Sequence, residues 1–253
     1  MSSESRIPTN LRTLLILEII GRSERALTAT EINQELGLPK QTVHRLCTTL
    51  EKEGFLIREP NGKRLLPSER TKLLASGVLF SSRNDFARRQ VLLAVASKIS
   101  ETVNLVIPEE DGMMYLDRVE TDWPFRIQLP VGSHVPFHCT ASGKTFLASL
   151  STTRRRAMVR NLKLNAKTAN THSDPEEFLS ELSKIARRGY AIDNEEFMEG
   201  MVALAVPITD REGRYCASLA FHGPTQRLSV ESVLEHKDTL QNGAEQLSEV
   251  FFQ

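Results

Sequence analysis

Cysteine is scarce in the 253-residue sequence, and the three present, Cys47, Cys139 and Cys216, lie far apart. No two of them form a Cys-x-x-Cys pair, which argues against a disulfide framework and for a reducing compartment. Neither the cysteines nor the histidines have the spacing of a zinc site. The sequence therefore predicts no bound metal and no cofactor.

Long apolar runs are also missing. No stretch approaches 18 uninterrupted apolar residues, so no segment is expected to span a membrane. The first six residues lack the basic-then-apolar build of a secretory signal, and no repeat or low-complexity tract occurs. With 40% apolar and 25% charged residues, we expect a cytoplasmic, globular protein of two ordinary domains or one large one.

Net charge is absent too, because 32 basic residues balance 32 acidic ones. This disfavours a structural protein that coats nucleic acid. The charges are divided unevenly: residues 1–83 hold 13 Lys and Arg against 9 Asp and Glu, whereas residues 84–253 hold 19 against 23. A mildly basic N-terminal part followed by a mildly acidic remainder fits a protein that contacts phosphates with one domain only.

A helix-turn-helix pattern occupies residues 28–53. Thr28 or Thr30 can cap a helix that stops at Gly37, and Pro39 is suited to begin the next helix. That next helix has an apolar stripe at helical spacing, formed by Val43, Leu46, Cys47 and Leu50.

Two predicted strands, residues 55–57 and 64–66, flank a turn at residues 60–63 directly after this pattern. A strand pair in this place makes a wing. We therefore predict a winged helix-turn-helix that reads double-stranded operator DNA in the major groove. The alternatives are a three-helix bundle with an ordinary polar face, and a solvated wing tip with no DNA role.

Side chains suited to DNA contact are expected on both parts of this motif. Gln can bond adenine, Arg or Lys can bond guanine, and Thr can touch a base or a phosphate. Wing residues are expected on the DNA backbone, where they position the domain without reading sequence. The candidates are Thr28 at the helix cap, Lys40, Gln41, Thr42, His44, Arg45 and Thr49 on the second helix, and Arg58, Lys63 and Arg64 in the wing.

Three parts are expected along the chain: a DNA-binding domain over residues 1–66, a linker helix over residues 67–83 and a second domain over residues 84–253. The linker is more apolar than a solvated one, so it should pack on something, such as a second subunit. The second domain alternates helical and strand patterns, which predicts an α+β fold. The elements expected there are a helix over 86–101 with Phe86 inward, strands over 102–107, 113–119, 125–131, 202–208 and 215–221, and helices over 174–188 and 229–252.

The segment from Pro136 to Lys144 is the best candidate for a site in the second domain. Its small residues precede a helix, where unpaired backbone N–H groups and the helix dipole favour a carboxylate or phosphate. A plain tight helix start is the alternative. The acids Asp193, Glu195 and Glu196 lie close together in the sequence, as in a metal site or in catalysis by paired carboxylates. A solvated acidic loop is the favoured interpretation.

Six stretches, in order along nearly the whole chain, carry a family resemblance. They are LGLPKQTVHRL at 36–46, LEKEGF at 50–55, YLDRVE at 115–120, PFHCTASGK at 136–144, RGYAIDNEE at 188–196 and GPTQR at 223–227. On these residues the chain resembles the IclR family of transcriptional regulators. The resemblance implies a winged helix-turn-helix, a linker helix used in dimerisation, and an effector-binding domain with a GAF-like mixed sheet and flanking helices. It also implies a homodimer or homotetramer on a palindromic or repeated operator.

Small organic effectors of this family, often carboxylates, occupy a pocket at the loop and acidic stretch described above. Glyoxylate-type members of the family carry Cys and Ser at three of the pocket positions, where this chain has Ala203, Ala220 and His222. This difference indicates a larger or less polar effector. Carried over by motif, the effector-binding residues would be Ala141 and Ser142 through their N–H groups, with Asp193, Ala203, Ala220 and His222 lining the pocket.

These observations predict a ligand-responsive repressor or activator of a catabolic operon that senses a small organic acid or an aromatic metabolite. We expect no enzymatic activity. The alternative is an enzyme with an appended DNA-binding head, using Asp193, Glu195 or His138 in acid–base work. The sequence gives that alternative only single polar residues.

Overall fold

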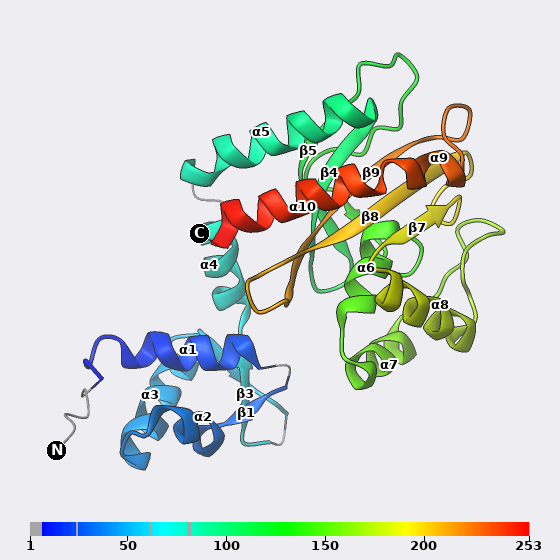
Figure 1. The fold of residues 1–253 in the computed structure, drawn as a ribbon. Coiled ribbons are helices and arrows are strands. Elements are labelled where there is room, and N and C mark those ends of the chain that lie inside the picture. The colour runs from blue at the N-terminus through cyan, green and yellow to red at the C-terminus, as the bar shows by residue number, and fades with distance from the viewer. Residues whose placement is uncertain (1–6, 24, 61, 80–81, 253) are drawn as a thin grey trace. The chain divides into compact units, whose positions relative to one another are not determined.

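The computed structural model describes residues 7–23, 25–60, 62–79 and 82–252 (Figure 1). The chain divides into two compact units, residues 1–81 and 82–253. No helix within the described ranges is both long and apolar enough to cross a membrane.

The first unit confirms the predicted winged helix-turn-helix. Its strands form an antiparallel sheet in the order β1-β3-β2, of which β1 was not predicted. Asn61, in the predicted wing turn, lies outside the described residues. The elements are α1 (Arg12–Arg22), β1 (Leu27–Thr28), α2 (Ala29–Leu36), α3 (Lys40–Lys52), β2 (Leu56–Arg58), β3 (Arg64–Pro67) and α4 (Glu69–Leu79).

Local signals set the ends of α2. The side chain of Thr28 accepts a hydrogen bond from the Glu31 backbone N–H at 3.2 Å, and a Glu31 oxygen accepts from the Thr28 N–H at 2.7 Å. This reciprocal cap satisfies two N–H groups that the helix leaves unpaired. Gly37 ends α2 in the left-handed region at φ 62°, which only glycine adopts without steric cost. Pro39 caps α3, which therefore begins one residue later than expected.

The second unit is an α+β fold, as predicted. Its six strands follow the order β6-β5-β4-β9-β8-β7, and each neighbouring pair is antiparallel, so the expectation of a mixed sheet was wrong. The strands are β4 (Thr102–Pro108), β5 (Met113–Val119), β6 (His134–Val135), β7 (Ala191–Asn194), β8 (Met201–Thr209) and β9 (Tyr215–Pro224). The helices are α5 (Ser82–Ile99), α6 (Ala141–Ser149), α7 (Thr152–Asn161), α8 (Pro175–Arg188), α9 (Val230–Glu235) and α10 (Lys237–Phe252).

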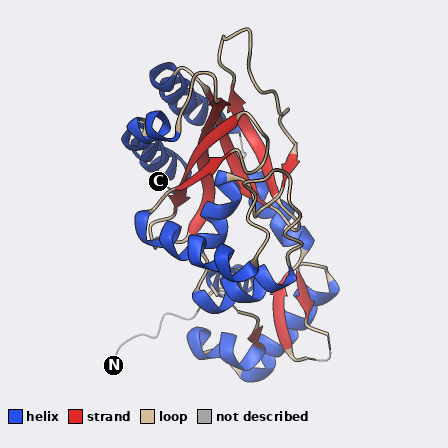
Figure 2. Ribbon diagram, turned by 90° about the vertical axis from the view of Figure 1, so that its right-hand side faces the viewer, coloured by secondary structure: helices blue, strands red, loops and turns tan. Residues whose placement is uncertain are grey.

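Helices pack on both sides of this sheet (Figures 1 and 2). Since side chains alternate along a strand, each strand contributes to both faces. One face packs against α5 and α10 and includes large buried side chains, among them Val103, Leu105, Val202, Leu204, Leu219 and Phe221. The other face contacts α6 and includes small and polar side chains, among them Asn104, Asp193, Ala203, Ala205, Ala220 and His222.

Three further expectations, for the helices and strands of this unit, were wrong. Residues 125–131 form no strand, because the carbonyls of Phe125 and Ile127 bond arginine and histidine side chains instead of a neighbouring strand. Phe86 is 74% exposed, since the buried side of α5 begins only at Arg88. The final helix is broken at His236 into α9 and α10.

Candidate functional site

The six residues carried over by resemblance surround one small cavity in the second unit. Its volume is about 20 Å³, close to what one water molecule needs. An effector larger than water therefore requires the lining to move. The cavity is lined by Asn104, Tyr115, Thr140, Ala141, Ser142, Asp193, Phe197, Met201, Ala203, Ala220, Phe221 and His222.

The start of α6 forms one wall of the cavity. The Thr140 hydroxyl caps this helix by accepting a hydrogen bond from the Gly143 N–H at 3.1 Å. The N–H groups of Ala141 and Ser142 precede the first internal bond that the helix can make, so the helix cannot use them. A helix is confirmed here, but it begins at Ala141, inside the stretch that was expected to precede it, so Ala141 and Ser142 are its first two residues.

Small residues let α6 approach the sheet closely. Ala141 packs in one buried cluster with alanines from β8 and β9. A Cβ on Gly143 would lie 2.3 Å from the carbonyl oxygen of Phe137, so only glycine fits there. The cavity exists because the side chains facing α6 are short.

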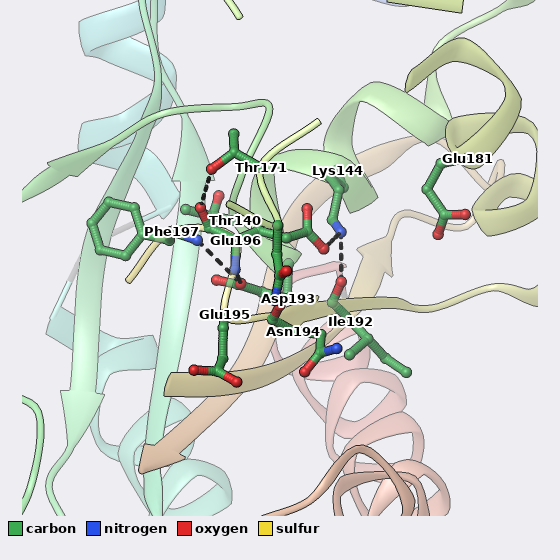
Figure 3. A network of polar contacts seen from close by, with 12 residues as sticks. Thr140, Lys144, Thr171, Glu181, Ile192, Asp193, Asn194, Glu195, Glu196 and Phe197 are labelled. Carbon is green, nitrogen blue, oxygen red and sulfur yellow. Dashed lines mark hydrogen bonds and ion pairs between the residues drawn. The ribbon is translucent and has the colours of Figure 1, made fainter. Parts of the chain in front are cut away.

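Asp193 closes the cavity from β7 and is fully buried. One carboxylate oxygen accepts hydrogen bonds from the N–H groups of Glu196 at 2.8 Å and Phe197 at 3.3 Å (Figure 3). The other has no partner among the described residues. Burial, together with the nearby charge of Glu196, raises the pKa of Asp193 to about 7. Near neutral pH this carboxyl group can therefore donate or accept a hydrogen bond.

The expectation of a solvated acidic loop at Asp193–Glu196 was wrong. Glu196 is buried and forms an ion pair with Lys144, whose side chain is only 1% exposed (Figure 3). The same ammonium donates a hydrogen bond to the Ile192 carbonyl at 2.6 Å. Glu195 accepts one from the Gly200 N–H at 2.7 Å. The ion pair with Lys144 thus balances the buried charge of Glu196.

His222 is buried on β9 and has a hydrogen-bond partner at each ring nitrogen. Nε2 lies 3.2 Å from the Ile127 carbonyl, so it carries the proton, and Nδ1 accepts from the Asn104 amide at 3.0 Å. Burial lowers the pKa of His222 to about 4, so the ring is neutral at physiological pH. Asn104, which sequence reasoning missed, keeps a buried oxygen without a partner among the described residues.

The side chains considered for a metal or for acid–base work are bonded within the chain, as far as the structure describes it. Within the described ranges, no group of three or more His, Cys, Asp or Glu side chains could hold a metal ion. His138 bonds the Asn165 carbonyl at 2.9 Å, while Asp193 and Glu195 bond backbone N–H groups. Each of the three residues proposed for acid–base work is bonded to a different part of the chain.

On the first unit, most of the predicted DNA-contacting side chains of α3 are exposed, and Thr42 is half-buried. A groove of about 420 Å³ brings together Thr28, His44, Arg58 and Lys63 from β1, α3 and the wing. Its nine lining residues are Thr28, Ala29, Thr30, His44, Cys47, Thr48, Arg58, Lys63 and Leu65.

The two wing arginines also have partners inside this unit. Arg58 donates to both carboxylate oxygens of Glu51, at 2.9 and 2.5 Å. Arg64 bonds the Ala26 carbonyl at 2.8 Å and contacts Glu31 at 3.1 Å. They therefore hold the wing against α2 and α3, whatever else they contact.

The winged helix-turn-helix and the separate α+β domain define a DNA-binding transcriptional regulator. Two family models match: the IclR helix-turn-helix domain over residues 11–60, and the bacterial transcriptional regulator IclR C-terminal domain over residues 86–249. The chain belongs to the IclR family.

Relatives cover nearly the whole chain. A protein of Cupriavidus necator described as "Probable transcriptional regulator SauR" is 37% identical over 241 residues, which are 95% of this chain and 96% of that protein. The transcriptional repressor IclR of Escherichia coli is 30% identical over 88% of this chain and 82% of its own length. The Thermotoga maritima IclR crystal structure superposes with a TM-score of 0.64 at 28% identity, covering 97% of this chain and 99% of that one. These relatives are transcriptional regulators.

Proposed function

We propose that the protein is a cytoplasmic, ligand-responsive regulator of a catabolic operon, and that a small carboxylate in the cavity beside α6 controls its affinity for operator DNA. The observation that carries this proposal is the start of α6, where the N–H groups of Ala141 and Ser142 adjoin a buried cavity. Unpaired N–H groups and the helix dipole stabilise an anion at such a place. Asp193, Ala203, Ala220 and His222 shape the rest of the cavity.

Operator recognition is assigned to α3 and the wing. Lys40, Gln41, Thr42, His44 and Arg45 lie on the first two turns of α3, the part that enters the major groove in this motif. The remaining contacts, mainly to phosphates, are assigned to Thr28, Thr49, Arg58, Lys63 and Arg64.

The exposed apolar side of α4 supports a homodimer or homotetramer. Leu73, Leu74 and Val78 are each more than half exposed, which is unusual for three large apolar side chains on one short helix. Pairing two copies would bury them and place two recognition helices about 34 Å, or a multiple of this, apart on the DNA. An effector then acts by favouring one arrangement of the two heads.

The test is fluorescence anisotropy with the DNA upstream of the protein's own gene, with and without small carboxylates. Arg45→Ala is expected to weaken specific binding by about 1–3 kcal/mol. The control, Arg160→Ala, removes an exposed arginine of α7 and should leave binding unchanged. Absence of specific, salt-dependent binding would refute the operator role, and carboxylates without effect on binding would refute the ligand switch.

A further inference from the structure

Arg118 on β5 lies on the same side of the sheet as the cavity because of a β-bulge. Leu105 pairs with Asp117 and Val106 pairs with Tyr115, so Leu116 is an extra residue in β5. In a regular strand Tyr115 and Arg118, three residues apart, would face opposite sides. The bulge turns Arg118 to the side of Tyr115, where its direct neighbour across the strands is Asn104. Both Tyr115 and Asn104 line the cavity.

The guanidinium of Arg118 is buried and only partly bonded. The side chain is 5% exposed. Nη2 donates to the Ile127 carbonyl at 3.3 Å, whereas Nε and Nη1 have no hydrogen-bond partner among the described residues. The carboxylate of Glu120 forms an ion pair with Nε at 3.7 Å, but this distance is too long for a hydrogen bond. Buried polar groups are almost always bonded, and a buried charge without its acceptors is costly, so these donors point to an acceptor that the chain does not supply.

The Ile127 carbonyl shows where that acceptor would bind. It accepts hydrogen bonds from both Arg118 and the cavity residue His222. Ile127 lies in the irregular segment between β5 and β6, which Arg227 also holds, through the Phe125 carbonyl at 3.0 Å. A single backbone oxygen therefore occupies the position at which a carboxylate could bond the guanidinium and the imidazole together.

Arg118 is better suited to bind an anion than the other charged groups near the cavity. Lys144 is paired with Glu196, and Arg126 is paired with Glu120 at 3.1 Å. His222 is neutral, and Asp193 brings no positive charge. The start of α6 and Arg118 are thus two separate places at the cavity that favour an anion.

We propose that Arg118 binds a second acidic group of the effector, displacing the Ile127 carbonyl, and that the effector is a short dicarboxylate rather than a monocarboxylate. One carboxylate lies on the N–H groups of Ala141 and Ser142, and the other on Arg118 and His222. This assignment rests on the proposed function, which supplies the first carboxylate. Because the Ile127 carbonyl is displaced, the segment around Ile127 moves when the effector binds.

The test measures the unfolding midpoint of the full-length protein against increasing malonate, succinate, propionate and butyrate at constant ionic strength and pH 6.5. The dicarboxylates are expected to raise the midpoint at lower concentration than the monocarboxylates. Arg118→Gln should weaken the apparent affinity for dicarboxylates by roughly 10- to 100-fold and leave the weak monocarboxylate effect unchanged. Arg118→Lys, which keeps the charge but not the forked donors, should lie between the two.

Arg126→Gln is the matched control, because it removes a neighbouring, more exposed arginine, and it should respond like the unaltered chain. Equal dicarboxylate affinity in the unaltered chain and both Arg118 variants would overturn the role of Arg118. A preference of the unaltered chain for monocarboxylates would overturn the dicarboxylate. If neither class raises the midpoint of the unaltered chain, the carboxylate of the proposed function fails, and the role of Arg118 fails with it.

Discussion

The two faces of the six-stranded sheet are built from the same strands but from different kinds of residue. Val202, Leu204, Leu219 and Phe221 pack against the helices on one face, whereas their immediate neighbours Ala203, Ala205, Ala220 and His222 face α6. Large side chains gain free energy when they are removed from water, and alanines gain little. One face therefore supplies most of the stability, and the other supplies a cavity.

This division implies that stability and ligand binding can be altered separately. A substitution on the apolar face should lower the free energy of unfolding without changing the shape of the cavity. A substitution on the small face should change the cavity at a lower cost in stability. The following variants test that separation.

Leu219→Ala should have the largest effect on stability. Leu219 is completely buried on the apolar face, and truncation leaves a void that the packing cannot fill. The free energy of unfolding should fall by about 2–5 kcal/mol, measured by urea denaturation. Succinate binding, measured where the variant is folded, should be unchanged. Loss of both properties together would contradict the separation of the faces.

Asp193→Asn should change how stability depends on pH. The pKa of Asp193 is raised to about 7, so the folded chain holds this proton more tightly than the unfolded chain does. Between about pH 4 and pH 7 this residue makes the folded state less stable as pH rises, by at most about 1.4 kcal/mol per pH unit.

An asparagine does not titrate. The unfolding midpoint of the variant, relative to the unaltered chain, should therefore rise from pH 4 to pH 7 and then stay level. His222, whose pKa is lowered, gives the opposite slope between about pH 4 and 6.5, but it does so in both proteins and cancels in the difference. A constant difference across this range would show that Asp193 is ionised throughout.

Gly143→Ala should disturb the small face through the position of α6. The added Cβ would meet backbone atoms of Phe137, so the helix must shift. We expect a loss of about 1–3 kcal/mol in unfolding free energy together with weaker succinate binding. Gly21→Ala is the control, since nothing lies within 4 Å of the added Cβ in α1, and it should stabilise the protein by up to about 1 kcal/mol.

Ala203→Val should have the smallest effect on stability and a large effect on binding. Its two extra methyl groups would fill a cavity of about 20 Å³. Unfolding free energy should change by less than about 1.5 kcal/mol, while the midpoint shift caused by succinate disappears. Val202→Ala, one residue away on the apolar face, should lower the free energy of unfolding and leave the midpoint shift caused by succinate unchanged. Two variants with the same effect on binding would show that the faces are not independent.

Local signals were sufficient for the two helices of the helix-turn-helix. Thr28, Gly37 and Pro39 act through hydrogen bonds and backbone angles within a few residues, so the sequence alone predicted α2 and α3 within one residue. The strands expected over residues 202–208 and 215–221 were also confirmed, and they pair with each other as β8 and β9.

The features that the sequence did not predict depend on contacts between residues far apart in the chain. The acids of residues 193–196 look solvated until Lys144, about fifty residues earlier in the chain, is placed against them. Residues 125–131 look like a strand, but their carbonyls bond Arg118, His222 and Arg227. Arg118 itself lies on the cavity side of the sheet only because of a bulge, which depends on the pairing of β5 with β4.

The bulge at Leu116 also bears on how the gene can change in length. Deleting this one codon would leave Tyr115 followed by Asp117, which is the regular pairing against Val106 and Leu105, so Arg118 would keep its orientation. Deleting a codon away from the bulge, such as that of Met114, would instead shift the residues on one side of it to the opposite face. The bulge is therefore the place in β5 at which a lost residue is tolerated, whereas a loss elsewhere in the strand would exchange core and cavity residues.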